Sequence, residues 1–219
     1  MPVQVKICGI TTREAADAAI RAGADFIGLV FHEKSPRNVS LHEAKEIAAI
    51  ARGRARVAPL LVNPDDFDIE NVMRGVKPDL LQLHGHETHV RVAAIAHKFG
   101  MPVIKAVGVA VADDVLHAER YEDVAEYLLF DAKGTWEDRS GGHGVPFDWT
   151  VLTGRTLRRP WFLAGGLTAD NVGHAIQISG ATMVDVSSGV EDVPGVKNAA
   201  KMAAFVAAAK NAQHTDNPV

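Results

Sequence analysis

The chain has 219 residues, enough for one domain with a full hydrophobic core, or at most two domains. Apolar residues make up 47% and charged residues 23%, a balance that excludes a disordered protein. With 23 basic and 27 acidic residues the net charge is −4, and we expect no nucleic-acid partner and no polybasic membrane patch. The N-terminus has no signal-peptide pattern and no run reaches the ~20 apolar residues of a membrane span, so a cytoplasmic protein is expected.

Short β-branched apolar segments alternate along the chain with longer amphipathic segments rich in Ala, Glu, Lys and Arg. This pattern predicts alternating strands and helices. The strand-like segments begin near Val3, Phe26, Arg56, Leu80, Pro102, Tyr127, Trp161 and Met183. One unit therefore takes about 26 residues, which suits one strand, one helix and short turns.

Two hydroxyl residues followed by glutamate at the third position after them predict helix starts. Thr11 with Glu14, and Ser40 with Glu43, have the spacing of a capping box. In this motif the hydroxyl accepts a bond from a backbone amide while the glutamate reaches back to the cap residue. The helices at these two places are therefore expected to begin just after Thr11 and Ser40.

Strands that alternate with helices join in parallel through right-handed crossovers. Eight such units predict a single eight-stranded parallel (β/α)8 TIM barrel over residues 1–210, with a polar C-terminal tail at 211–219. The alternative is an open doubly wound sheet. The absence of a dinucleotide-binding glycine motif favours the barrel.

Active sites of β/α barrels lie where the strands end, so polar residues at those ends are the candidates for chemistry. Members of a pair two residues apart on one strand face the same way. Charged groups in apolar strands are costly unless they are paired or used. The candidates are Lys6 and Cys8, Gln82 and His84, Lys105, Asp131 and Lys133, and Asp185 and Ser187.

Two glycine-containing turns follow the last two strand-like segments. Gly165 and Gly166 end the seventh, and Ser187, Ser188 and Gly189 end the eighth. Glycines let a phosphate approach backbone amides, and the loops after strands 7 and 8 of barrels often hold one. Each turn alone could simply be tight, but two at neighbouring strands favour a phosphate site.

Seven short motifs occur in a fixed order between residue 6 and residue 191. They are Lys6-Ile7-Cys8-Gly9-Ile10-Thr11, Ser35-Pro36-Arg37, Leu81-Gln82-Leu83-His84-Gly85, Phe130-Asp131, Gly141-Gly142 to Phe147-Asp148-Trp149, Gly165-Gly166-Leu167 with Asn171-Val172, and Asp185-Val186-Ser187-Ser188-Gly189-Val190-Glu191. In this order they resemble the phosphoribosylanthranilate isomerase family of tryptophan biosynthesis. Two positions depart from the usual pattern: His143 replaces a small hydroxyl residue, and Asn38 replaces an aromatic.

The resemblance implies an Amadori rearrangement of N-(5-phosphoribosyl)anthranilate to an open-chain aminodeoxyribulose phosphate, with no metal or organic cofactor. It implies Cys8 as general base, Asp131 as general acid and Arg37 as the contact to anthranilate. The phosphate would lie on the turns at Gly165-Gly166 and Ser187-Ser188-Gly189. We place His84 among the substrate-binding candidates and expect no metal site.

These residue types suit the chemistry. A buried carboxylic acid, with its pKa raised from about 3.9, can protonate the ribose ring oxygen. A thiolate, from a group with a reference pKa of about 8.5, can then remove a proton from the neighbouring sugar carbon. Cys8 is the only thiol in the chain. From the residues alone, Cys8 could also be inert core, Asp131 a partner of Lys6 or Lys133, and Arg37 a solvated side chain.

Other functions stay open at this point. His84, His86 and His89 lie close in sequence and would suit a metal-dependent hydrolase of phosphosugars, although their spacing is not that of a metalloprotease helix. A non-catalytic phosphosugar-binding protein is a second alternative, and a histidine-pathway aminoaldose a second substrate. The segment from Lys133 to Trp149 is long enough for a lid. The chain could be a monomer or a homodimer.

Overall fold

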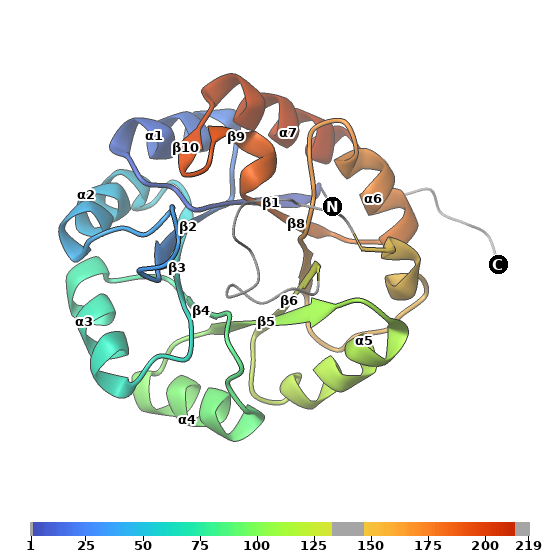
Figure 1. Ribbon diagram of the computed structural model, residues 1–219, viewed down its shortest axis with the longest axis horizontal. Helices are drawn as coiled ribbons and strands as arrows, with labels where there is room; N and C mark the ends of the chain where they lie inside the picture. The colour runs from blue at the N-terminus through green and yellow to red at the C-terminus, as the bar shows by residue number, and fades with distance from the viewer. Residues whose placement is uncertain (1, 133–146, 213–219) are drawn as a thin grey trace.

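The computed structural model describes residues 2–132 and 147–212. Eight parallel strands close into a barrel in chain order (Figure 1). They are β1 (Gln4–Cys8), β2 (Phe26–Phe31), β3 (Arg56–Leu61), β4 (Leu81–Leu83), β5 (Val103–Val109), β6 (Tyr127–Ala132), β7 (Trp161–Leu163) and β8 (Met183–Val186). Each strand begins within one residue of its expected position, and the predicted (β/α)8 barrel is confirmed.

Helices surround the ring of strands (Figure 1). They are α1 (Arg13–Ala22), α2 (Leu41–Ala51), α3 (Asp66–Val76), α4 (His89–Phe99), α5 (Ala112–Ala118), α6 (Val172–Ser179) and α7 (Ala199–Asn211), with the 3-10 helices η1 (Glu119–Tyr121), η2 (Trp149–Leu152) and η3 (Ser188–Val190). In the described segment from residue 147 to β7, η2 replaces the expected α-helix. Gly154, with φ 69°, and Pro160 follow too closely for a longer helix.

Of the two predicted helix starts, the one after Ser40 is confirmed and the one after Thr11 is wrong by one residue. Ser40 and Glu43 form the expected capping box at the start of α2. At α1 the cap is Thr12, whose side chain accepts a hydrogen bond from the amide of Ala15. Thr11 instead donates its hydroxyl to the carbonyl of Gly195, a long-range contact that no local spacing rule contains.

Two apolar layers hold the barrel together, one between the strands and the helices and one inside the ring. Phe26 and Phe162 lie in the inner layer, with their rings edge to face and 5.3 Å apart. Because side chains two residues apart on a strand face the same way, Lys6, Gln82 and Asp185 also face the interior, closer to the strand ends. The interior is thus apolar at its base and polar towards the carboxyl ends of the strands.

The far end of the chain adds two features. A two-stranded hairpin, β9 (Glu191–Val193) and β10 (Val196–Lys197), interrupts the connection from β8 to α7 and was not expected from the sequence. Helix α7 packs against α1 and ends at Asn211. The polar tail expected at 211–219 stays a prediction, because residues 213–219 lie outside the described residues. Of the helices in the described segments, none is both long and apolar enough to cross a membrane.

Candidate active site

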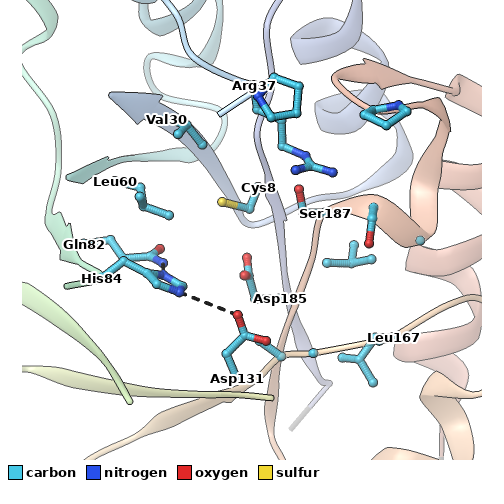
Figure 2. A pocket seen from close by; sticks show the side chains of 18 of the residues that line it. Cys8, Val30, Arg37, Leu60, Gln82, His84, Asp131, Leu167, Asp185 and Ser187 are labelled. Atoms are coloured by element: carbon cyan, nitrogen blue, oxygen red, sulfur yellow. Dashed lines mark hydrogen bonds and ion pairs between the residues drawn. The ribbon is translucent and has the colours of Figure 1, made fainter. Parts of the chain in front are cut away.

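One pocket, here called the mouth pocket, opens at the carboxyl ends of the barrel strands (Figure 2). It contains all nine site residues predicted from the sequence, which come from six different strand ends or loops. They are Cys8, Arg37, His84, Asp131, Gly165, Gly166, Ser187, Ser188 and Gly189. Figure 2 shows Arg37 and Asp131 on opposite sides of the view, with Cys8 and Asp185 between them.

Cys8 is the last residue of β1 and is 5% exposed. Its side chain packs against Val30 and Leu60 in a small apolar cluster. Burial raises the pKa of the Cys8 thiol, while the ammonium groups of Lys6 and Lys197 act in the opposite direction. Cys8 is therefore buried, yet it lies beside cations that favour its thiolate.

Gly28 on β2 leaves the space that the Cys8 side chain occupies. A Cβ at this position would lie 2.7 Å from Cys8 Sγ and 3.1 Å from Lys6 Nζ. Atoms inside a packed barrel cannot move away freely. The position of the Cys8 sulfur therefore requires a glycine at residue 28 of the neighbouring strand β2.

We expect Gly28→Ala to displace Cys8, to reduce catalytic turnover and to lower the free energy of unfolding by about 1–3 kcal/mol. Urea unfolding and steady-state kinetics measure the two effects. Gly173→Ala in α6 is the matched control, because a Cβ there meets no atom within 4 Å. Equal behaviour of the two variants would contradict the proposed crowding at Gly28.

Asp131 lies near the end of β6, across the barrel from β1. Its Oδ1 accepts a hydrogen bond of 2.8 Å from the amide of Ala132, and its Oδ2 lies 3.6 Å from His84 Nε2. A Cβ on Gly165 would lie 2.9 Å from Asp131 Oδ1, so a glycine makes room here too. The alternative pairing of Asp131 with Lys6 is wrong, because Lys6 binds Asp185, and Lys133 lies outside the described residues.

The Gln82 side chain on β4 contacts His84, the histidine that faces Asp131. The Gln82 amide nitrogen lies 2.9 Å from His84 Nδ1, and the other ring nitrogen, Nε2, is the one that faces Asp131. Gln82 is fully buried, and its Oε1 has no hydrogen-bond partner within the described part of the chain.

Arg37, in the loop after β2, is buried and held by Glu191 of the β9–β10 hairpin. Its Nε and one terminal nitrogen each donate a 2.7 Å hydrogen bond to the Glu191 carboxylate. Lys197 donates a 2.6 Å bond to the same carboxylate, and its side chain is fully buried. Burial raises the pKa of Glu191, but its bonds to Arg37 and Lys197 outweigh this effect and hold the pKa below the ordinary value.

The two glycine-containing turns lie side by side and are fixed by their neighbours. Asn171 accepts a bond from the Thr168 amide and donates one to the carbonyl of Gly166. Any Cβ on Gly189 would overlap the carbonyl oxygen of Leu167, so the turns after β7 and β8 touch. They form one continuous backbone surface at the side of the mouth pocket.

Some candidate residues do not belong to this pocket. Lys105 turns out of the barrel, where its Nζ binds Glu87 at 2.7 Å, because Ile104 and Ala106 occupy the inward positions of β5. His86 and His89 line a separate surface depression, away from His84. Within residues 2–132 and 147–212, no three His, Cys, Asp or Glu side chains are placed to hold a metal ion.

Two residues of the site were missed by sequence reasoning. Lys197 donates to both the carbonyl and the hydroxyl of Ser187, at 3.0 and 3.2 Å, and thus connects the β8 turn to Glu191. Gly28 lies in the middle of β2, and nothing in the sequence near it indicates that Cys8 needs the space it leaves. The predicted lid runs from Lys133 to Trp149, and its residues 133–146, which include His143, lie outside the described residues.

Comparison with known proteins agrees with this geometry. The family model for N-(5'-phosphoribosyl)anthranilate (PRA) isomerase matches residues 5–208. N-(5'-phosphoribosyl)anthranilate isomerases of Paramagnetospirillum magneticum and Rhodospirillum centenum are 52% and 51% identical, over 96% and 95% of this chain and 98% and 99% of theirs.

Solved structures give the same result. The crystal structure of phosphoribosyl anthranilate isomerase from Thermotoga maritima is 37% identical, with a TM-score of 0.86 over 95% of this chain and 98% of its own. A crystal structure of a phosphoribosyl anthranilate isomerase in complex with reduced 1-(o-carboxyphenylamino)-1-deoxyribulose 5-phosphate has a TM-score of 0.82 at 34% identity, over 95% of this chain and 98% of its own. The chain belongs to the N-(5'-phosphoribosyl)anthranilate isomerase family.

Proposed function

We propose that this chain converts N-(5-phosphoribosyl)anthranilate to 1-(2-carboxyphenylamino)-1-deoxyribulose 5-phosphate, with Asp131 as general acid and Cys8 as general base. The observation that carries the proposal is the shared pocket: a carboxyl group, a thiol, an arginine and two glycine-containing turns line one cavity. A related structure binds the reduced form of this product. The step belongs to tryptophan biosynthesis.

Asp131 starts the reaction by donating a proton to the ribose ring oxygen. The bond between that oxygen and C1′ breaks, and the anthranilate nitrogen forms an iminium with C1′. Oδ1 of Asp131 is already bound to the Ala132 amide, so the proton is expected on Oδ2.

Cys8 completes the step as the base. Its thiolate removes the proton from C2′; the C–H electron pair forms the C1′=C2′ bond, and the positive charge on nitrogen is neutralised. The enolamine then tautomerises to the product: the 2′-hydroxyl loses its proton to form the ketone, and C1′ takes up a proton. A general base typically contributes 10²–10⁴-fold to the rate.

The two anionic ends of the substrate match the two sides of the pocket. The backbone turns after β7 and β8 suit the phosphate, since glycines allow close approach of backbone amides. Arg37 suits the anthranilate carboxylate, because Glu191 uses one edge of its guanidinium and leaves the other nitrogen for the substrate.

We expect Arg37→Lys to raise KM for phosphoribosylanthranilate roughly 30-fold with a smaller effect on kcat, because one charge-assisted hydrogen bond is worth about 2 kcal/mol. Lysine keeps the charge but cannot span Glu191 and the substrate together. Arg52→Lys, at an exposed position after α2, is the control. An unchanged KM would remove Arg37 from the substrate site.

Growth complementation tests the proposed function directly. A bacterial strain without this isomerase, transformed with the gene, is expected to grow on minimal medium lacking tryptophan. A phosphosugar-binding protein without catalysis would not support growth. Activity of the purified protein in excess chelator separates the isomerase from a metal-dependent hydrolase, and the histidine-pathway aminoaldose serves as the comparison substrate.

Location and assembly follow as expectations from the same function. We expect a cytoplasmic enzyme whose partner is this small phosphoribosyl compound. Both a monomer and a homodimer suit the barrel, since the related isomerase of Thermotoga maritima is dimeric and a structure of monomers generated from it has been solved. Light scattering of the purified chain distinguishes the two states.

A further inference from the structure

A buried ion pair lies next to Cys8, two residues earlier along β1. Lys6 on β1 and Asp185 on β8 face each other in the strand register, and Lys6 Nζ binds Asp185 Oδ1 at 2.8 Å. The Lys6 side chain is fully buried. Burial of a lysine ammonium costs several kcal/mol, so its presence inside a barrel calls for a physical explanation.

Lys6 lies beside the sulfur as well as the carboxylate. A Cβ on Gly28 would lie 3.1 Å from Lys6 Nζ and 2.7 Å from Cys8 Sγ, so the ammonium and the sulfur border the same small space. Burial lowers the pKa of Lys6, but Asp185 and Cys8 outweigh this and hold it above the ordinary value. Lys6 is therefore a buried cation beside the sulfur.

The other groups around Cys8 do not replace this cation. Lys197, from β10, has a smaller favourable effect on the thiolate than Lys6 and is itself bound to Glu191 and Ser187. Asp185 opposes the thiolate. The neighbours on β2 and β3, namely Gly28, Val30 and Leu60, carry no charge.

We propose that Lys6 is a positioning residue of the isomerase, whose buried ammonium is oriented by Asp185 and stabilises the thiolate form of Cys8. This inference rests on the proposed role of Cys8 as the base. Asp185 has two opposing effects: it keeps Lys6 protonated and directed at the sulfur, and its own charge disfavours the thiolate. The strand pairing of β1 with β8 thus supplies the base with its counterion.

Ultraviolet titration of the thiolate tests the proposal on the full chain, because Cys8 is the only cysteine and accounts for the whole thiol signal. Lys6→Met keeps the length of the side chain and removes its charge. We expect its titration midpoint to rise by at least about one pH unit. Lys105→Met removes another buried, ion-paired lysine and is expected to leave the midpoint unchanged.

A double variant protects the test against misfolding. Lys6→Met combined with Asp185→Asn leaves no unpaired charge at the site. Its midpoint is expected between those of the wild type and Lys6→Met, since both the counterion and the opposing carboxylate are lost. If Lys6→Met does not fold, a double-variant midpoint above that of the wild type supports the proposal, and one at or below it overturns the proposal.

The pH profile of kcat/KM gives a second readout. If Lys6 stabilises the thiolate, the acid limb of the profile of Lys6→Met moves to higher pH together with the thiol midpoint. A merely structural lysine would leave both in place, and that result overturns the inference. If the thiol midpoint shifts in Lys6→Met but the wild type shows no isomerase activity, the proposed function is rejected while the electrostatic role of Lys6 stands.

Discussion

Replacement of Cys8 by alanine is expected to lower kcat for phosphoribosylanthranilate by about 10³-fold, because the variant has no base to remove the C2′ proton. KM is expected to change little, since the anion contacts at Arg37 and at the two backbone turns remain. Steady-state kinetics from the loss of substrate fluorescence measure both constants.

The structure of the Cys8 site limits the side effects of this change. Cys8 packs in a small apolar cluster with Val30 and Leu60, so truncation to alanine is expected to cost about 1 kcal/mol of stability. Cys8→Ser is the control for shape, because a serine hydroxyl is far harder to deprotonate than a thiol. A Cys8→Ala enzyme within a few-fold of wild-type kcat would rule out the thiol as the base.

Replacement of Asp131 by asparagine is expected to reduce kcat by a comparable factor, about 10²–10⁴-fold, because the amide cannot protonate the ring oxygen. The asparagine oxygen can still accept the Ala132 amide, so the fold and the neighbouring glycine contact are preserved. Single-turnover kinetics isolate the ring-opening step from product release.

Ligand binding separates a catalytic from a structural role of Asp131. Asp131→Asn is expected to bind reduced 1-(o-carboxyphenylamino)-1-deoxyribulose 5-phosphate with nearly wild-type affinity, measured by calorimetry. Weak binding combined with a lower melting temperature would mean that the carboxylate holds the pocket together. In that case the acid must be sought elsewhere in the mouth pocket.

The strands could be predicted from sequence because local and global signals agree in them. Parallel strands buried on both faces read as continuous apolar segments, and eight regular repeats leave few architectures. The end of each strand then lies at one edge of the barrel, so residues as distant as Cys8 and Asp131 had to approach each other. The period-2 alternation also placed Gln82 with His84, and Asp185 with Ser187, on the inside.

The contacts that position these side chains could not be predicted in the same way. Lys105 was grouped with the site because it lies near the end of a strand, but its inward or outward direction depends on register, and Glu87 holds it outside. Pairs such as Arg37 with Glu191, or Gly28 with Cys8, join residues far apart in sequence. Such pairs appear only when the barrel closes.

The irregular parts of the barrel escaped prediction for a related reason. The hairpin of β9 and β10 is short and lies in a loop, where no hydrophobic period marks it. Its function becomes clear from the side chains it carries, since Glu191 and Lys197 join the Arg37 loop to the β8 turn. The expected helix before β7 is replaced by η2 because glycine and proline end it early.

The most direct test of this account follows a single turnover of phosphoribosylanthranilate by its fluorescence, with enzyme in excess over substrate generated in situ. The wild type is expected to consume the substrate and form the ketone product, while Cys8→Ala and Asp131→Asn retain the bound substrate with its fluorescence nearly unchanged. Consumption by either variant at a rate close to that of the wild type would contradict acid and base catalysis by this pair.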